Sequence, residues 1–421
     1  MDRRQSRPWW NGVLLMSGKL PLDGIRIVDF SWVGAGPITT RLLAEFGAEV
    51  IRLETKKRPE ILRLTGPYKD GIAGIERSGY YSVRNPNKKS IDIDMNHPKA
   101  RDLVVEMIKQ SDIVINNFTL GTMEKWNLGY EEVKKIKPDI IYVTMPIQGS
   151  TGPHRNFMGF GATMNALVGI NYLTGFPDKE PFGTGTNYPD HVPNPTHTAF
   201  AIIAALWHRR KTGEGQSIEV AQTEVALNVL PSAIMDYAAN NRIQARMGNR
   251  DLIAAPHGVY KTLGNRRWIA LAIFNDSEWA ALVKVMGNPS WTEDGRFGTL
   301  TGRLEHQDEL DELIENWTSE QEPYHLMDTF VGAGIRAGVV QNAKDLLEDP
   351  HLHARGYWIY LNHPEMRRHV YNNSPFRLSK TPTQIRTPAP LLGQHTDEVL
   401  RDVLGLSQRE IDKLKQERVV G

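Results

Sequence analysis

The sequence predicts an α/β fold with a parallel sheet, and three observations lead to this prediction. Strand-like apolar runs alternate with helix-like segments through the first third of the 421-residue chain. Hydrophobic residues make up 40% of the chain, which is enough for a sizeable core. No run of about 18 apolar residues occurs, so nothing predicts a membrane-spanning helix. We therefore expect a soluble, cytoplasmic globular protein.

The elements of the first third follow one another in a regular order. Pro37 is expected at the first position of the first helix, and Gly47 directly past its end. Because parallel strands need crossover helices between them, the pattern predicts βαβ units. Strands are expected at 24–30, 49–54, 90–95, 112–118 and 139–146, and helices at 37–46 and 98–109.

The rest of the chain changes character twice. A Gly- and Pro-rich stretch leads into a helix for which Asn194 is the expected N-cap, with Pro195 in the first turn and Gly213 after the end. Further on, short strands in APHGVYKTLGNRRWIALAIFND and two helices, near 277–286 and 304–319, predict a smaller α+β region. Two short amphipathic helices are expected in the C-terminal tail.

Charge and cysteine content exclude several classes of protein. Lys and Arg total 50 and Asp and Glu total 49, so no charge excess predicts nucleic acid or an anionic membrane as a partner. With Cys 0, the chain has no disulfides, zinc ribbons or thiol nucleophiles, which fits a reducing cytoplasm. Residues 1–18 lack the apolar core of a signal peptide, so we expect an N-terminal extension with Met16 as an alternative start.

The stretch VGAGPITTRLLAEFGAEVIRLE imitates a dinucleotide-binding fingerprint. Gly34 and Gly36 follow the first strand, and Glu54 ends the second. Thr39, however, occupies the third glycine position, and Pro37 removes a backbone N–H that should face a pyrophosphate. The glycines therefore favour a tight β–α turn over nicotinamide or flavin binding.

The stretch NYPDHVPNPTH (187–197) crowds three prolines around Asp190 directly before a helix. A stiff surface turn would explain the prolines, since Pro, Asn and Asp dominate turns. A nucleophilic carboxylate held in a fixed position would explain them as well.

Motifs along most of the chain resemble those of the class III CoA-transferases, the family that includes formyl-CoA transferase and carnitine CoA-transferase. They are LPLDGIRIVDFSWVGAGPITTRLLAEFGAEVIRLE, YSVRNPNKKSIDIDM, DIVINNFTLGTMEKWNLGYEEVKKIKPDIIYVTM, AFAIIAALWHRRKTGEGQSIEVAQTEVAL and APLLGQHTDEVL. The resemblance implies a large Rossmann-like CoA-binding domain from 19–225 and 335–421, with a smaller α+β domain at 240–332. It also implies an interlocked dimer, either of identical chains or with a homologous subunit. CoA thioesters would be substrates, with no tightly bound cofactor and no metal.

The resemblance further implies that Asp190 is the catalytic residue. The family carries one aspartate shortly before the helix that here reads AALWHRRKTGEGQ, and Asp190 matches it across a one-residue gap. A gapless count would place His191 there, and Asp178 is a nearby carboxylate in a turn-like stretch. The carboxylate would attack a thioester, and the released thiolate would then form an aspartyl-CoA thioester. Backbone N–H groups of FGTGTN (182–187) are a plausible source of oxyanion donors.

The family's CoA-contacting positions transfer to a set of loop residues. A basic turn at RNPNKKS (84–90) would suit phosphates, although such a run also reads as a solvated loop. Gly34 stands where the transferases often carry glutamine, which implies a different substrate pocket. HGVY (257–260) lies in the region of the oxalate enzyme's glycine-rich lid, and no such lid is evident. The implied CoA-binding residues are Thr55, Asn85, Pro86, Asn87, Lys88, Asn117, Phe118 and Lys125.

Two alternatives share the fold. An α-methylacyl-CoA racemase would need a histidine where this chain has Phe160, and a phenyl ring cannot relay a proton. His154, six residues earlier, reads as a solvated turn residue. A non-catalytic subunit of a heteromeric transferase would have lost Asp190, which this chain keeps.

Substrate identity is the least determined feature. The stretch GTNYPDHVPNPTH is similar to the succinyl-CoA:benzylsuccinate group of transferases, which act in toluene breakdown, so succinyl-CoA and an aromatic dicarboxylic acid are candidate substrates. Arg41, Arg77 and Arg84 are candidates for pairing with a second carboxylate. Aromatic residues that would line a pocket, or belong to the core, are Tyr172, Phe176, Phe182 and Tyr188.

Overall fold

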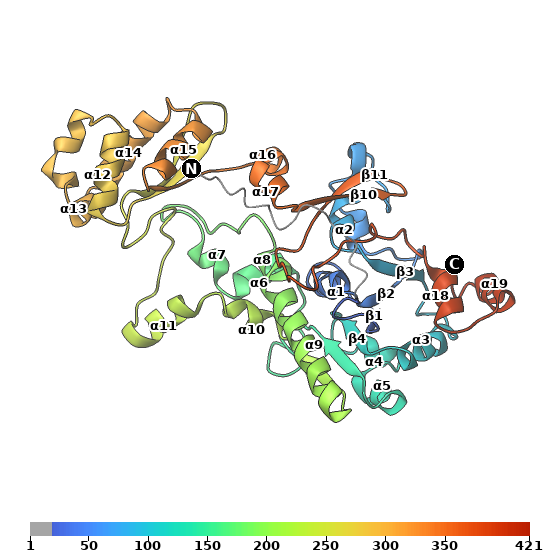
Figure 1. Ribbon diagram of the computed structural model, residues 1–421. Coiled ribbons are helices and arrows are strands. Elements are labelled where there is room, and N and C mark those ends of the chain that lie inside the picture. The colour runs from blue at the N-terminus through green and yellow to red at the C-terminus, as the bar shows by residue number, and fades with distance from the viewer. Residues whose placement is uncertain (1–18) are drawn as a thin grey trace. The chain divides into compact units, whose positions relative to one another are not determined.

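The computed structural model describes residues 19–421, and its chain trace is shown in Figure 1. The expected N-terminal extension at 1–18, including Met16, lies outside the described residues. The chain divides into two compact units. Among the described residues, the first unit contains 19–164, 187–229 and 354–421, and the second contains 165–186 and 230–353.

The first unit is built on a six-stranded sheet in which every neighbouring pair of strands is parallel. The strand order is β3-β2-β1-β4-β5-β6, so the prediction of an α/β fold with a central parallel sheet is confirmed. The last strand was not expected from the sequence, because it is short and alternates between half-buried and exposed residues. The strands are β1 (Arg26–Asp29), β2 (Glu49–Glu54), β3 (Lys88–Asp92), β4 (Ile113–Asn116), β5 (Ile141–Thr144) and β6 (Gln216–Glu219).

Helices cover both faces of this sheet (Figure 1). One face packs on α1 (Ala35–Glu45) and α9 (Pro193–Thr212), and the other on α3 (Ala100–Lys109), α5 (Tyr130–Ile136) and the C-terminal helices α18 (Thr396–Asp402) and α19 (Gln408–Gln416). Neighbouring residues Ile27 and Val28 are both fully buried, one in each core. Burial on both faces explains why the central strands β1, β4 and β5 are rich in Ile and Val.

Shorter elements complete the first unit. An antiparallel hairpin pairs Trp358 with Asn372 and His363 with Arg367. The elements are η1 (Ile61–Leu64), η2 (Lys69–Gly71), α2 (Gly79–Ser82), α4 (Thr122–Lys125), α8 (Tyr188–His191), α10 (Gln222–Leu227), β10 (Trp358–His363) and β11 (Arg367–Asn372). Two further helices cross the division between the units, α6 (Gly161–Leu167) and α17 (Pro350–Ala354).

The second unit contains a three-stranded antiparallel sheet, β7-β8-β9, packed on helices through its own apolar core. The helix expected at 304–319 is instead two helices separated at His306, whose ψ of 30° lies outside the helical range. The elements are α7 (Ile170–Leu173), α11 (Pro231–Asn240), β7 (His257–Lys261), β8 (Trp268–Ala272), α12 (Asp276–Val285), η3 (Ser290–Glu293), η4 (Gly295–Phe297), α13 (Leu300–Glu305), α14 (Gln307–Thr318), α15 (Pro323–Gly332), β9 (Arg336–Val339) and α16 (Ala343–Glu348).

Two predicted helix starts are wrong by two residues. The helix before Gly213 begins at Pro193, with Val192 as its N-cap, whereas Asn194 was expected to be the cap. Asn194 is instead fully buried and donates to Gln222 Oε1 at 3.3 Å, so its amide serves packing rather than the helix end. The first helix starts at Ala35, which makes Pro37 its third residue rather than its first.

The strand order places a topological switch point between β1 and β4. From β1 the chain runs outward through β2 to β3, and from β4 it runs the other way through β5 to β6. Ligands of open parallel sheets bind beyond the carboxyl ends of the strands at such a point. The segments that leave these two strands, at 30–34 and 117–121, are therefore where a binding site is expected.

Candidate active site

Asp190 is the third residue of the short helix α8. Its side chain is only 6% exposed, and Pro189 before it is buried as well. The helix ends at His191, and α9 begins at Pro193, so the aspartate lies one residue before the end of a helix that is joined directly to the next one. The prolines predicted to restrict this segment do surround a buried carboxylate, which a surface turn would not contain.

Two glycines from distant parts of the sequence contact the Asp190 side chain. A Cβ added to Gly34 would lie 2.8 Å from Asp190 Cβ, and one added to Gly161 would lie 2.8 Å from its Cγ. Real Cβ atoms essentially never approach this closely, so any larger residue would displace the carboxylate. Gly161 also donates its backbone N–H to the Asp190 carboxylate. Gly34, which replaces the family's glutamine, therefore contacts Asp190 directly.

Burial changes the acidity of this carboxyl group. Desolvation raises the pKa of Asp190 to about 6, against the opposing effects of the Gly161 hydrogen bond and the Arg84 charge. The group is therefore ionised at neutral pH, yet more basic than an ordinary aspartate. A carboxylate with a raised pKa, held in a fixed position, is suited to act as a nucleophile or base.

His191, the residue that a gapless count would make catalytic, is held by two side chains. Arg84 Nη2 donates to His191 Nε2 at 2.8 Å, and the Tyr80 hydroxyl lies 3.1 Å from the same nitrogen. Burial and the Arg84 charge lower the pKa of His191 to about 4, so the ring is uncharged at neutral pH. Because Nε2 accepts from a guanidinium, the ring proton is on Nδ1.

The loop after β1 carries Gly34 to the carboxylate, and Asn117 at the end of β4 fixes this loop. Asn117 Oδ1 accepts from the Trp32 backbone N–H at 2.8 Å, and its Nδ2 donates to the Trp32 carbonyl at 2.7 Å. The next residue, Val33, has a φ of +65°, which is a strained value for a β-branched residue. Its backbone N–H donates to the buried Glu60 carboxylate. The loop therefore has its shape because two side chains bond to its backbone.

A group of buried charges supports Glu60. Glu60 pairs with Arg52, and both side chains are fully buried. Arg52 also lies 3.7 Å from Glu54, which accepts from Arg63 at 2.8 and 2.9 Å. Breaking one member of such a buried group would leave an uncompensated charge.

Three of the residues expected to contact CoA lie at or near the switch point. Asn117 binds the Trp32 backbone as described, and the Phe118 ring lies edge-on to Trp32 at 5.9 Å between centroids. Phe118 also packs against Trp126 at 5.9 Å, directly after Lys125, which is exposed at the end of α4. Half-buried aromatic rings and an exposed amine form a surface on which a nucleotide base and phosphates would fit.

The side chains of Asn85 and Lys88 lie in the interior, so the segment Asn85–Lys88 is not simply a solvated loop. Lys88 is 2% exposed, and its Nζ donates to the Pro37 carbonyl at 2.8 Å and to Asn85 Oδ1 at 2.9 Å. Burial lowers the pKa of Lys88 to about 7. Asn87 accepts from the backbone N–H groups of Arg386 and Thr387, which ties the turn to the C-terminal segment. Pro86 is buried, and Thr55 is half-buried directly after β2.

Other candidates from the sequence lie outside this arrangement. Asp178 is exposed and pairs with Lys179 at 3.1 Å. Phe160 is 58% exposed directly before Gly161, and His154 stacks on Phe157 with ring centroids 4.4 Å apart. The racemase position is thus adjacent to the residue that contacts Asp190, and it holds a phenyl ring.

The candidate aromatic residues are surface groups rather than core. Tyr172, Phe176 and Phe182 are 50%, 47% and 47% exposed in the second unit. Tyr188, in the first unit, is half-buried on α8. Within residues 19–421, no three His, Asp or Glu side chains are grouped as a metal ion requires. None of the described helices has both the length and the apolar composition needed to cross a bilayer.

Sequence reasoning missed the roles of Gly161, Glu60 and Val33. Of these three residues, only Gly161 could have been suspected from the sequence, because it follows Phe160, the residue that aligns with the racemase histidine. Val33 and Glu60 are 27 residues apart, and neither lies in a motif that predicts their hydrogen bond.

The chain is similar to known proteins along most of its length. Residues 22–396 match the family described as CoA-transferase family III. Succinyl-CoA–D-citramalate CoA-transferase of Chloroflexus aurantiacus is 35% identical over 95% of this chain and 98% of its own. The succinyl-CoA–L-malate CoA-transferase beta subunit of that organism is 31% identical, with coverages of 95% and 98%.

A solved structure shares the fold. The CAIB/BAIF family protein from Brucella suis superposes with a TM-score of 0.84 at 29% identity, and covers 92% of this chain and 100% of its own. The family match and the curated relatives together show that the chain is a CoA-transferase and belongs to CoA-transferase family III.

Proposed function

We propose that the chain transfers CoA from an acyl-CoA donor to a carboxylic acid through an aspartyl-CoA thioester formed on Asp190. The observation that carries this proposal is the buried, ionisable carboxylate in contact with Gly34 and Gly161. A nucleophile that forms hydrolysable intermediates must be kept from water and held in attack geometry. Asp190 meets both conditions, and the other candidate carboxylate, Asp178, is exposed.

The reaction proceeds by four acyl transfers. A carboxylate oxygen of Asp190 attacks the thioester carbon, the C–S bond breaks, and the CoA thiolate leaves a mixed anhydride. The thiolate attacks the Asp190 carbonyl and the donor acid departs, which gives the aspartyl-CoA thioester. The acceptor carboxylate then displaces the thiolate, and the thiolate attacks the acceptor's carbonyl and releases Asp190. No proton is gained or lost overall.

The residues around Asp190 have separate tasks in this scheme. The raised pKa makes the carboxylate a better nucleophile than an ordinary aspartate, while it stays ionised at neutral pH. The Gly161 N–H is aimed at the carboxylate oxygens, where negative charge develops in the two steps that attack the Asp190 carbonyl.

CoA is proposed to bind beyond the carboxyl ends of β1 and β4. The aromatic surface of Trp32 and Phe118 would take the adenine, and exposed amines near it would meet phosphates. This surface belongs to the proposed large domain at 19–225 and 335–421, of which 165–186 and 335–353 group with the second compact unit, and 240–332 is the proposed small domain. The proposed contact positions are Thr55, Asn85, Pro86, Asn87, Lys88, Asn117, Phe118 and Lys125.

Succinyl-CoA is the proposed donor. The relatives described above are named for succinyl-CoA paired with D-citramalate or L-malate, which are dicarboxylic acids. A dicarboxylic acid is therefore the proposed acceptor, and benzylsuccinate belongs among the acids to be tested. The active form is proposed to be an interlocked cytoplasmic dimer, of identical chains or with a homologous subunit.

Mass spectrometry tests the intermediate. The purified protein is mixed with succinyl-CoA and quenched with hydroxylamine, which converts an aspartyl thioester or anhydride into a hydroxamate. We expect the label on the peptide that contains Asp190, its absence in Asp190→Asn, and its retention in Asp178→Asn. A label elsewhere, or deuterium exchange next to the thioester of a branched acyl-CoA without any label, would overturn the proposal.

A further inference from the structure

We propose that Arg84 binds the second carboxylate of a dicarboxylic substrate at the Asp190 site. The inference rests on the proposed function and names the residue that selects dicarboxylic over monocarboxylic acids. Three arginines were candidates from the sequence, and their contacts in the structure separate them.

Arg41 is already neutralised. Its Nε donates to Glu45 at 2.7 Å within helix α1. Its remaining N–H groups bond to the Val83 carbonyl and to Asn372, so the guanidinium fastens the hairpin β10–β11 to the first helix. A substrate carboxylate would have to displace a buried acid of the protein itself.

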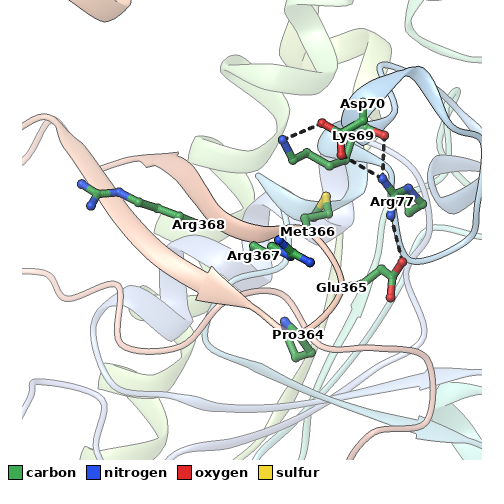
Figure 2. Close-up of a pocket in the computed structure, with 8 residues that line it drawn as sticks. All are labelled: Lys69, Asp70, Arg77, Pro364, Glu365, Met366, Arg367 and Arg368. Atoms are coloured by element: carbon green, nitrogen blue, oxygen red, sulfur yellow. Dashed lines mark hydrogen bonds and ion pairs between the residues drawn. The ribbon is translucent and has the colours of Figure 1, made fainter.

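Arg77 is neutralised in a different place. Figure 2 shows it in a pocket of about 690 Å³ at the turn between β10 and β11, with its guanidinium directed to two acids. It lies 2.9 Å from Glu365 and 3.2 Å from Asp70, and it also donates to the Lys69 carbonyl. Lys69 in the same pocket pairs with Asp70 as well. These ion pairs give Arg77 its counter-charges, and they hold the turn.

Arg84, unlike Arg41 and Arg77, has no acid paired with its guanidinium among the described residues. It is only 9% exposed, and within residues 19–421 it forms no ion pair with a carboxylate. Its hydrogen bonds go to uncharged acceptors, the Tyr80 carbonyl at 3.2 Å and His191 Nε2 at 2.8 Å, and its Nε has no partner among the described residues. The guanidinium lies over the Tyr80 ring, 3.7 Å from its centroid. A buried cation without a counter-ion is costly, and proteins keep such groups where a ligand brings the charge.

The position of Arg84 connects this unbalanced charge to the reaction. It bonds to the residue next to Asp190, and its charge acts on the Asp190 carboxylate. In the free protein Asp190 is therefore the anion that partly balances Arg84. Once Asp190 becomes an anhydride or a thioester its negative charge is gone, and Arg84 keeps only its weaker interaction with Glu60, which is already paired with Arg52. The second carboxylate of a bound dicarboxylic acid would supply a nearby anion at that stage.

A competition assay tests this inference. Glutarate and pentanoate have the same chain length and differ in one terminal carboxylate. Both acids are offered together with succinyl-CoA, and the ratio of the two CoA thioesters formed is measured. Because both acceptors react with the same enzyme intermediate, the ratio reports acceptor selectivity and not the donor step.

We expect the wild type to favour glutarate, and Arg84→Gln to lower the product ratio by about 10- to 100-fold, the usual effect of losing a hydrogen bond to a charged group. Arg84→Lys keeps the charge but cannot form the bidentate contact, so its product ratio should lie between those of the wild type and Arg84→Gln. Arg84→Lys also tests the inference if Arg84→Gln does not fold. Arg77→Gln is the matched control and should keep the wild-type ratio.

The outcomes separate the inference from the proposed function. If the wild type forms no hydroxamate on Asp190 and transfers CoA to neither acid, the proposed function fails. If it is active but both Arg84 variants keep the wild-type ratio while their overall rate falls, Arg84 only positions His191 and Asp190, and the inference fails alone. An equal loss of selectivity in Arg77→Gln would overturn it as well.

Discussion

At the scale of single residues, the cost of burying Asp190 should be measurable. With a folded-state pKa of about 6, and an ordinary one after unfolding, the ionised group destabilises the folded protein at high pH. The folded state regains this free energy as the pH falls and the carboxyl group takes up a proton. The difference corresponds to about 3 kcal/mol above pH 7, an upper figure that solvent screening will reduce. Asp190→Asn should therefore stabilise the protein at pH 8 by roughly 1–3 kcal/mol.

Urea unfolding of the wild type and of Asp190→Asn at pH 8 and pH 4 checks this expectation. The gain should shrink by about 2 kcal/mol at the lower pH, where the wild-type carboxyl group is protonated. Asp178→Asn, at an exposed aspartate whose pKa is lowered by its hydrogen bond to Lys179, should give no gain in stability at pH 8. An equal gain at both pH values would mean that burial does not raise the pKa of Asp190.

Gly161 offers a second test at this scale. A methyl group at Gly161 would overlap the Asp190 carboxylate, so Gly161→Ala should slow adduct formation on Asp190 by roughly 100-fold, a loss typical of a misplaced reacting group. The measurement is the rate of hydroxamate formation after rapid mixing with succinyl-CoA. The matched control is Gly295→Ala, because a Cβ there meets nothing within 4 Å. Equal rates for the wild type and Gly161→Ala would show that the carboxylate is not confined.

At the scale of elements, the loop after β1 has a strained backbone conformation at Val33, which side chains from other segments stabilise. Val33 adopts its left-handed conformation because Glu60 accepts its N–H, and Glu60 is held in turn by Arg52. Glu60→Gln removes the charge of this pair, so we expect the loop to relax and adduct formation on Asp190 to slow by roughly tenfold. Glycine adopts a positive φ without strain, so Val33→Gly in the same chain should restore part of the lost rate. The rates of the single and double variants are compared by hydroxamate formation.

The restored rate distinguishes positioning from general damage. A chain that is only destabilised by Glu60→Gln would lose further stability with a second substitution, and its rate would not recover. Failure of Val33→Gly to improve the rate would therefore contradict the role assigned to Glu60. Thermal unfolding of each variant shows whether the rates refer to folded protein.

The same loop shows how far the sequence could predict this protein. Most of the five strands at 24–30 through 139–146 were predicted because burial on both faces produces apolar runs that are visible in the sequence, whereas the strand expected at 90–95 alternates apolar and polar residues. Asp190 was singled out as the candidate catalytic residue because prolines crowd around it and because its surroundings resemble a known family. The hydrogen bond from Val33 to Glu60, and the internal partners of Lys88, depend on how distant segments pack. No local pattern encodes them, and a run of basic residues such as RNPNKKS looks equally suited to solvent.

At the scale of the whole molecule, helix α9 carries apolar side chains on two opposite faces. Its inner face is buried on the sheet through Ile202 and Ala205. Its outer face carries Phe200, Ile203 and Trp207 at helical spacing, and these are 74%, 48% and 58% exposed. A helix that is apolar on both sides is normally buried, and an exposed apolar row of this kind is typical of an interface. The row therefore supports the proposed dimer.

Replacing two residues of this row should separate the chains. Phe200→Glu together with Trp207→Glu places charges where an apolar contact is expected, so the variant should elute as a single chain while the wild type elutes with the mass of two. Size-exclusion chromatography with light scattering, at micromolar concentration, makes the measurement. Gln416→Glu, at an exposed polar position on α19, is the control and should leave the mass unchanged. A wild type that already has the mass of one chain would refute the dimer. A double variant that stays dimeric would place the interface elsewhere, because two buried carboxylates without partners would cost more than such a contact supplies.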